Sequence, residues 1–336
     1  MFQHILVPLD GSPLAEQALP VAVRLARASG GKVSLLNVVD IYQMYVPYGA
    51  MQPLMSQETI DGCIASAGHY LDRLLHREDM AGVPGNKQVV LGNPPLAILA
   101  EIDEQAIDLV VMSSHGYAGI TRWVMGSTAE KIMHHSPVPV LILHDGKPLD
   151  IHLRPDGTSA VRALVPLDAS ARSQDVIAPA AALVAALSTP GQGALHFLQI
   201  VVPPKDGSKE ERETLLQQAR QNLQTTSENI RDGLVANVGP ELHLKLSWSV
   251  ALEDDIAGGI MGIAESSEKA ADTGVWETSD LIAMTTHGYT GIQKWTMGSI
   301  AERVLHTTRL PLLLVRPADM IMKEHREKQG QAKPAA

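Results

Sequence analysis

Short apolar runs alternate with longer segments of helical periodicity along this chain of 336 residues. The runs have the length of strands and are bounded by polar turn residues, which is typical of buried strands in a parallel sheet. After the first run, one helical face carries five apolar residues: Leu14, Ala18, Val21, Ala22 and Leu25. Because Pro20 lies inside that pattern, we expect this helix to be kinked or to begin late, and Pro179 predicts the same in the second half. The alternation of strands and helices predicts an α/β fold with a doubly wound parallel sheet.

Each half of the chain contains five such runs. In the first half we expect strands at 5–10, 32–39, 108–112 and 138–143, a further strand ending near Leu91, and a long helix at 58–77. In the second half we expect strands at 163–168, 195–202, 280–284 and 312–315, a further strand ending near Val250, and a long helix at 210–235. The polar stretch 266–278 has no counterpart in the first half, so it predicts a surface insertion.

A long motif also occurs twice. Residues 114–120 read SHGYAGI and residues 286–292 read THGYTGI, and each motif leads to a Gly-Ser step at the same spacing, Gly126-Ser127 and Gly298-Ser299. An internal repeat of this kind indicates a duplicated folding unit, and the chain length fits two domains. We expect a first domain at residues 1–145, a polar linker at 146–159, a second domain at 160–317, and a charged tail at 318–336 that is frayed or disordered.

Composition removes several classes of function. The chain has 27 Lys and Arg against 37 Asp and Glu, a net charge of −10, which argues against a nucleic-acid surface. Its one cysteine cannot form an internal disulfide, and no Cys/His group has the spacing of a metal site. No apolar run of about 18 residues is present, and the first residues do not resemble a signal peptide. We therefore expect a cytoplasmic protein with no resident metal, no membrane span and no nucleic-acid partner.

The repeated loops have the pattern of an anion site. In a sheet of strand order 3-2-1-4-5, the carboxyl ends of the first and fourth strands are neighbours, so Asp10 and Asp168 should face the glycine loops. Gly126-Ser127-Thr128 opens a helix, whose first N–H groups can bind phosphate. The alternative is a glycine turn with Ser127 as an ordinary N-cap. Two copies beside a strand-end aspartate favour the anion site.

These motifs resemble those of a tandem universal stress protein. Nucleotide-binding members of that family carry Gly-x2-Gly-x9-Gly-(Ser/Thr) after the fourth strand. Both copies here keep the second glycine, the spacing and the Gly-Ser step, but Ser113 and Thr285 replace the first glycine. The resemblance covers about 1–145 and 160–316. It implies two five-stranded domains of order 3-2-1-4-5 that pair through their last strands as an intramolecular pseudo-dimer, and it leaves a further homodimer open.

The resemblance also implies which residues contact a nucleotide. Asp10 lies by the nucleoside, Val38 presents backbone groups to adenine, and Gly92 follows the third strand, where the second copy is aligned with Leu252. In the first copy the implied positions are Pro8, Asp10, Ser12, Val38, Gly92, Met112, Ser113, His115, Gly116, Gly126, Ser127 and Thr128. In the second copy they are Pro166, Asp168, Ser170, Ile200, Thr285, Gly288, Gly298, Ser299 and Ile300. Acidic residues after Leu252 make the first site the better candidate.

The implied ligand is ATP, with AMP or ADP as alternatives and Mg²⁺ as an optional companion, in a protein of stress response or signalling. Hydrolysis should be slow or absent, because the sequence has no P-loop lysine and no placed base, and we expect no catalytic residue. His115 and His287 have no triad partner, so loop packing is their expected role. A second hypothesis is an interaction protein on the same scaffold that binds no nucleotide, which Ser113, Thr285 and Leu252 favour. A third, an adenylyl transferase, lacks the motifs of that class.

Overall fold

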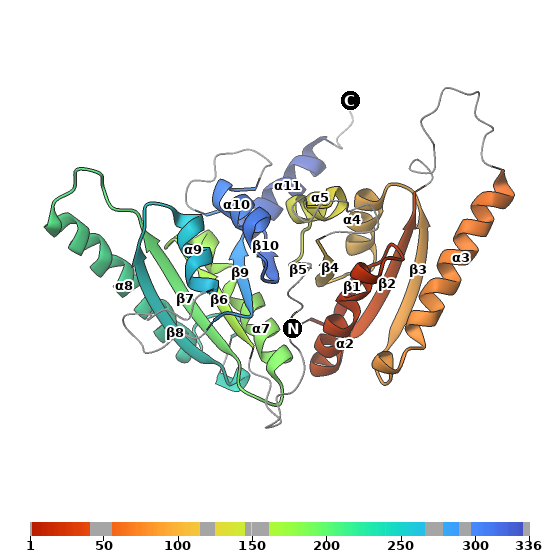
Figure 1. Cartoon of the computed structure of the whole chain (residues 1–336), viewed down its shortest axis with the longest axis horizontal. Helices are drawn as coiled ribbons and strands as arrows, with labels where there is room; N and C mark the ends of the chain where they lie inside the picture. Colours follow the sequence, from red (N-terminus) through yellow and green to blue (C-terminus); the bar gives the residue numbers. More distant parts are fainter. Residues whose placement is uncertain are drawn as a thin grey trace. The chain divides into compact units, whose positions relative to one another are not determined.

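The computed structural model describes residues 2–40, 56–114, 125–144, 149, 161–238, 240–265, 278–288 and 297–331. Contacts divide the chain into two compact units, Phe2–Pro148 and Leu149–Ala336, which we call the N-terminal and the C-terminal unit (Figure 1). The expected linker apart from Leu149, and the expected insertion at 266–278 apart from its last residue, lie outside the described residues.

The N-terminal unit alternates strands and helices, as its hydrophobic pattern predicts. Its strands are β1 (His4–Pro8), β2 (Lys32–Val39), β3 (Gly85–Leu91), β4 (Leu109–Ser113) and β5 (Val140–Leu143). Its helices are α1 (Pro13–Glu16), α2 (Ala18–Ser29), α3 (Gln57–Leu75), α4 (Pro94–Glu104) and α5 (Ser127–His135), with a 3₁₀ turn, η1, at Glu78–Met80.

The C-terminal unit repeats this order and adds one helix. Its strands are β6 (Arg162–Pro166), β7 (Ala194–Val201), β8 (Lys245–Leu252), β9 (Leu281–Thr285) and β10 (Leu312–Val315). Its helices are α6 (Ala171–Gln174), α7 (Ile177–Ser188), α8 (Lys209–Arg231), α9 (Ile256–Glu265) and α10 (Ser299–Thr307), with a 3₁₀ turn, η2, at Pro240–Leu242. The additional helix, α11 (Ala318–Gln331), occupies most of the charged tail.

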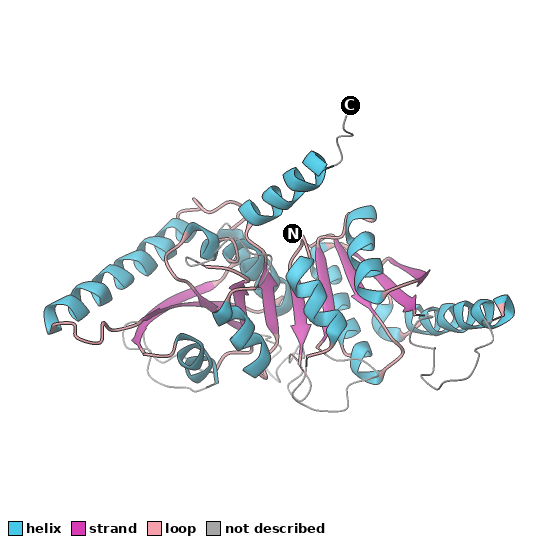
Figure 2. Ribbon diagram, turned by 90° about the horizontal axis from the view of Figure 1, so that it is seen from above, coloured by secondary structure: helices cyan, strands magenta, loops and turns pink. Residues whose placement is uncertain are grey.

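Each unit has the strand order that the sequence predicts. The N-terminal strands run β3-β2-β1-β4-β5 and the C-terminal strands run β8-β7-β6-β9-β10, all parallel to their neighbours within the unit. From the first strand the chain winds in one direction to the third, then crosses back to the fourth and fifth. Right-handed crossovers therefore place helices on both faces of each sheet, as Figure 2 shows. The carboxyl ends of the first and fourth strands are adjacent in both units.

The core of each unit is aliphatic. Residues of β1 such as Ile5, Leu6 and Val7 are fully buried, and Leu164 and Val165 of β6 are buried in the same way. In each sheet, buried polar side chains bond across neighbouring strands. His4 Nε2 bonds Ser34 Oγ at 2.6 Å, and in the C-terminal unit His196 bonds Ser247 Oγ at 2.8 Å and Ser249 Oγ at 2.7 Å. These bonds satisfy polar groups that would be costly to bury alone.

The prolines break the first helix of each unit as predicted. In the N-terminal unit α1 stops at Glu16 and α2 begins at Ala18, so Pro20 lies in the first turn of α2. In the C-terminal unit α6 stops at Gln174 and α7 begins at Ile177, which places Pro179 in the first turn of α7. The missing N–H of proline costs nothing there, because first-turn amides have no partner within their own helix.

Candidate functional site

The turn after β1 is built by an aspartate and a serine. Asp10 Oδ1 accepts a hydrogen bond from the Ser12 amide at 3.0 Å, and Ser12 Oγ accepts one from the Ala15 amide at 3.1 Å, which caps α1. Gly11 between them has a φ of +85°, a conformation that glycine adopts without strain. Asp10 thus holds the turn in place at the carboxyl end of β1 while its side chain remains exposed.

The turn after β6 is the same structure with one more bond. Asp168 Oδ1 accepts from the Ser170 amide at 3.0 Å and from Ser170 Oγ at 2.6 Å. Ser170 Oγ in turn accepts from the Ser173 amide at 3.1 Å and caps α6. Ala169 occupies the position of Gly11 with a φ of +64°, which is unfavourable for a residue with a β-carbon. The additional bond helps to hold this strained turn.

The fourth strand of each unit ends in buried hydroxyl residues. Ser113 and Ser114 are 6% and 1% exposed after β4, and Thr285 and Thr286 are 7% and 2% exposed after β9. The amide of Gly126 donates to Ser114 O at 2.9 Å, and the amide of Gly298 donates to Thr286 O at 2.8 Å. Each loop is therefore closed at its base in the same way. His115 and Gly116 lie outside the described residues.

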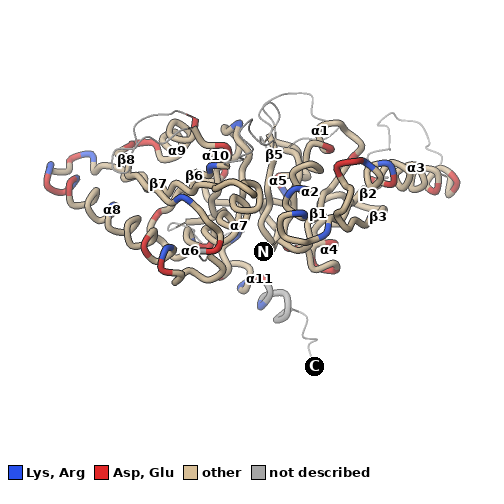
Figure 3. Tube along the Cα trace, turned by 90° about the horizontal axis from the view of Figure 1, so that it is seen from below, with Lys and Arg blue, Asp and Glu red and all other residues tan. Residues whose placement is uncertain are grey.

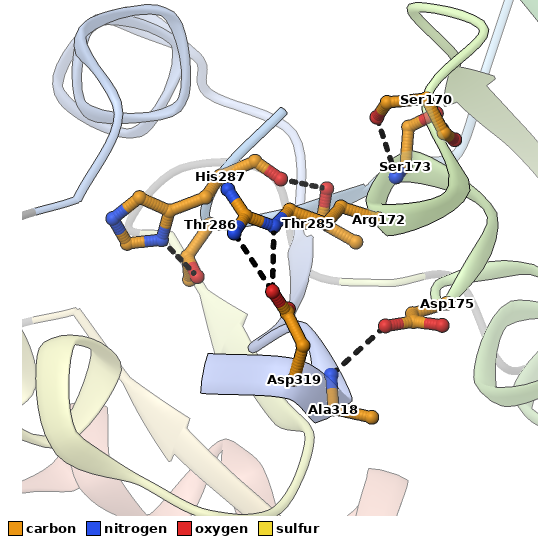
Figure 4. A network of polar contacts seen from close by, with 9 residues as sticks. All are labelled: Ser170, Arg172, Ser173, Asp175, Thr285, Thr286, His287, Ala318 and Asp319. Carbon is orange, nitrogen blue, oxygen red and sulfur yellow. Dashed lines mark hydrogen bonds and ion pairs between the residues drawn. The ribbon is translucent and has the colours of Figure 1, made fainter. Parts of the chain in front are cut away.

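In the C-terminal unit the start of the loop bonds to itself. Thr285 Oγ1 donates to His287 O at 2.9 Å, and Thr286 Oγ1 bonds His287 Nδ1 at 3.0 Å (Figure 4). His287 is 6% exposed, as its expected role in loop packing requires. The hydroxyl that replaces the first glycine of the family pattern is thus used to hold the loop backbone.

Glycine is the N-cap of the helix that follows each loop. Gly126 caps α5 and Gly298 caps α10, and neither has a side chain that could accept from the first amides of its helix. By contrast, serine side chains cap α1, α3, α6 and α8. The alternative in which Ser127 is an ordinary N-cap is wrong, because Ser127, like Ser299, is the first helical residue. Thr128 and Ile300 follow in the same first turn.

The first-strand aspartate meets the glycine loop directly in the C-terminal unit. A β-carbon on Gly288 would lie 2.0 Å from Asp168 Oδ2, so the carboxylate rests against the bare glycine backbone. This contact brings together the two motifs that the predicted strand order placed side by side. It also places a negative charge at the entrance of this loop.

The strand register corrects the alignment of the third-strand loops. Val39 of β2 is opposite Leu91 and Val201 of β7 is opposite Leu252, so Leu252 is the counterpart of Leu91. The counterpart of Gly92 is Glu253: the Gly92 amide donates to Val39 O at 3.1 Å and the Glu253 amide to Val201 O at 3.2 Å. The sequence alignment is therefore wrong by one position, and the loop is also one residue longer in the C-terminal unit.

The remaining predicted positions lie on the strands around these loops. Pro8 and Pro166 end β1 and β6, opposite Leu36 and Leu198. Val38 and Ile200 lie one residue before the ends of β2 and β7 and are half-buried. Met112 of β4 is 6% exposed and packs inside the N-terminal unit. All are near the carboxyl edge of their sheet.

Helix α11 is fixed to the segment that follows Asp168. The Arg172 guanidinium donates to Asp319 Oδ2 from Nη2 at 2.7 Å and from Nε at 3.0 Å, and the Ala318 amide donates to Asp175 Oδ2 at 2.9 Å (Figure 4). Glu324, one turn along α11, pairs with Arg316 at 2.8 Å. The tail that the sequence leaves as frayed or disordered therefore begins as an anchored helix.

Sequence reasoning missed Tyr70 of α3, which lies near Asp10 in the N-terminal unit. Burial raises the pKa of its phenol well above the usual value, and the nearby carboxylates of Glu16 and Asp10 raise it further. The phenol is thus a neutral hydrogen-bond donor close to Asp10. No motif could have revealed it, because Tyr70 lies on a helix far along the chain from the first strand.

Acidic and basic residues are mixed on the outer helices. Both signs occur along α3 and α8 (Figure 3). Among the residues that the structure describes, no group of three or more His, Cys, Asp or Glu could hold a metal ion. Within the same part of the chain, no helix is both long enough and apolar enough to cross a membrane.

Comparison with known proteins identifies the family. The model of the Universal stress protein family matches residues 1–144 and again residues 161–316. The chain belongs to the universal stress protein family and carries two copies of its domain.

Curated relatives and solved structures agree with this assignment. The universal stress protein YxiE of Bacillus subtilis is 26% identical over 158 residues, which cover 43% of this chain and 99% of YxiE. A universal stress protein of Methanocaldococcus jannaschii is 26% identical over 148 residues, 44% of this chain and 85% of that protein. The structure of a universal stress protein from Archaeoglobus fulgidus aligns over 94% of this chain and 97% of the A. fulgidus chain, with a TM-score of 0.59 and 17% sequence identity. The structure of a Pseudomonas aeruginosa PAO1 protein of unknown function aligns over 99% of this chain and 98% of the P. aeruginosa chain, with a TM-score of 0.60 and 16% sequence identity. These two structures share the fold of the whole tandem chain.

Proposed function

We propose that the N-terminal unit binds an adenine nucleotide, ATP in preference to AMP or ADP, at the carboxyl ends of β1 and β4. The bound nucleotide acts as a stabilising and switching ligand in stress response or signalling. A cytoplasmic location, where ATP is available, fits this role.

The observation that supports this proposal most is the start of α5. Gly126 is its N-cap and has no side chain to occupy the first-turn amides. Those N–H groups and the positive end of the helix dipole suit a phosphate. Ser127 and Thr128 add hydroxyl groups in the same turn. The residues present therefore fit the phosphates of a nucleotide.

The third-strand loop of the N-terminal unit carries no charge, since it consists of Gly92 and Asn93. Gly92 has a φ of +153°, and no atom of the described residues lies within 4 Å of the place where its β-carbon would be. By resemblance to the family, Pro8 and Val38 border the adenine and Asp10 and Ser12 the nucleoside. A Mg²⁺ ion would bind together with the phosphates at the start of α5 and would neutralise part of their charge.

We propose binding with slow or no hydrolysis. Residues 113–128 contain no lysine, so this loop lacks the cation with which a P-loop holds a transferring phosphate. We assign no catalytic residue.

The substitution Gly126→Asp tests the proposal. Its backbone angles, φ −64° and ψ 135°, are open to aspartate, which is a good N-cap. The new carboxylate would occupy the amides that the phosphate needs, so the helix should be stable while ATP affinity falls at least about tenfold. Gly298→Asp is the matched control in the C-terminal unit. Isothermal titration with Mg-ATP measures both variants, and equal affinity in wild type and Gly126→Asp rejects the site.

The second candidate function is an interaction protein that binds no nucleotide. The self-bonded Thr285 and the Asp168–Gly288 contact favour it for the C-terminal unit, since its own side chains fill the loop. Under this alternative the wild-type chain binds no ATP at millimolar concentration. The same titration therefore separates the two functions.

A further inference from the structure

The two units differ most sharply at the loop between the third strand and the next helix. In the N-terminal unit two residues, Gly92 and Asn93, connect β3 to α4. In the C-terminal unit three residues, 253–255, connect β8 to α9, and all are acidic. The helices beyond these loops are in register, since the Ala97 amide donates to Asn93 O and the Gly259 amide to Asp255 O. The third-strand loop thus exchanges a neutral pair for a negatively charged triplet.

Asp255 already has a partner for its charge. Arg303 of α10 donates to both its carboxylate oxygens at 2.6 Å, and these hydrogen bonds hold the pKa of Asp255 below its usual value. Glu253 differs, because within the described part of this unit its carboxylate makes no hydrogen bond or ion pair. Among the residues that the structure describes, no cation pairs with this charge.

The side chain of Glu253 lies beside Ile200, the counterpart of Val38, which the family resemblance places at the adenine. A β-carbon on Gly259 would lie 2.7 Å from Ile200 Cδ1 and 3.1 Å from Glu253 Cγ, so both side chains meet over this glycine. The N-terminal unit has Ala97 at the position of Gly259 and Val38 at that of Ile200. Gly259 makes the room in which the stem of Glu253 lies beside Ile200.

We propose that Glu253 is a specificity-determining residue that makes the C-terminal site reject nucleoside polyphosphates, so that the chain holds one ATP, in its N-terminal unit. This inference rests on the proposed function. A carboxylate that replaces the glycine repels the several negative charges of ATP, which is a common way to exclude a ligand. Asp168 against Gly288 adds a second negative charge in the same unit, at the start of the loop after β9. An uncharged nucleoside would be obstructed only by the size of the Glu253 side chain, because its charge would not repel a neutral ligand.

The test isolates the C-terminal site in the full-length chain. In a Gly126→Asp background, which silences the proposed N-terminal site, Glu253→Gln removes the charge and keeps the volume, and Glu253→Gly removes both. We expect both substitutions to raise Mg-ATP affinity at least about tenfold in isothermal titration, with less than about a twofold gain for adenosine from Glu253→Gln. Asp254→Asn, a neighbouring exposed acid, is the matched control and should give no gain. Thermal unfolding of each variant checks that it is folded.

The outcomes separate this inference from the proposed function. Two equivalent ATP molecules on the wild-type chain would overturn the role of Glu253 and leave nucleotide binding intact. One ATP on the wild type, with no gain from either Glu253 substitution, would also overturn it. No ATP on the wild type would reject the proposed function, and if the Glu253 variants then bind none either, both ideas fall.

Discussion

Asp168 Oδ2 lies directly against Gly288, at the place where any other residue would carry its β-carbon. The carboxylate cannot easily move away, because its other oxygen accepts two hydrogen bonds from Ser170. The contact joins the end of β6 to the loop after β9 and so defines the geometry of the C-terminal site.

We predict that Gly288→Ala destabilises the chain by about 1–3 kcal/mol, the usual cost of forcing a methyl group into occupied space. Urea unfolding measures the loss. The same substitution in an Asp168→Ala background is the control, since the obstructing oxygens are absent there. A loss of equal size in both backgrounds would show that the contact is not the cause.

We predict that the two capping serines differ in their contribution to stability. Ser12→Ala removes one cap bond, which typically costs about 1 kcal/mol. Ser170→Ala removes the cap and also the bond to Asp168, which holds Ala169 in its left-handed conformation, so it should cost more. Urea unfolding of both variants compares them directly. Equal losses would mean that the second bond contributes nothing.

We predict that stability falls in acid because of His196. Burial lowers its pKa from 6.5 to about 4, so the folded chain favours neutral imidazole. The stability that this represents is complete above pH 6.5 and is lost progressively as the pH falls toward 4. Between pH 7 and pH 5 the loss should be about 2 kcal/mol. Urea unfolding of wild type and His196→Gln at both values isolates this effect from the titration of carboxylates. Parallel losses in the two proteins would exclude His196 as the cause.

We predict that the two ion pairs of α11 contribute unequally to stability. Arg316 and Glu324 are 7% and 14% exposed, whereas Arg172 and Asp319 are 33% and 53% exposed. Glu324→Ala removes the carboxylate that pairs with the buried Arg316 guanidinium, so it should lower the free energy of unfolding by about 2 kcal/mol or more. Asp319→Ala should lower it by under about 1 kcal/mol. Hydrogen exchange of the α11 amides reports both. Faster exchange in Asp319→Ala than in Glu324→Ala would contradict the ranking.

Much of this fold follows from hydrophobic pattern and repeat. The strand at Lys32–Val39 is found at its predicted residues, because a short continuous apolar run between polar turns is typical of a buried strand. The break near Pro20 is equally local, since it depends on the ring of one residue. Strand order follows from the strand–helix alternation together with the family resemblance.

The details of the site depend on information that one sequence does not hold. The sequence alone aligns Gly92 with Leu252, and only the strand pairing reveals that Glu253 takes that position. The Asp168–Gly288 contact depends on a turn with a strained Ala169, which no propensity predicts. Arg172 and Asp319 are separated by 147 residues, and neither belongs to a recognisable motif.

The two domains are parts of one polypeptide, and this has an evolutionary consequence. In an assembly of two identical single-domain chains, a glycine-to-glutamate change would appear in every copy at once. Fusion frees each copy to mutate separately, so Gly92 and Glu253 can persist together in a fixed ratio. Every molecule then carries both forms of the third-strand loop, with Gly92 in one domain and Glu253 in the other.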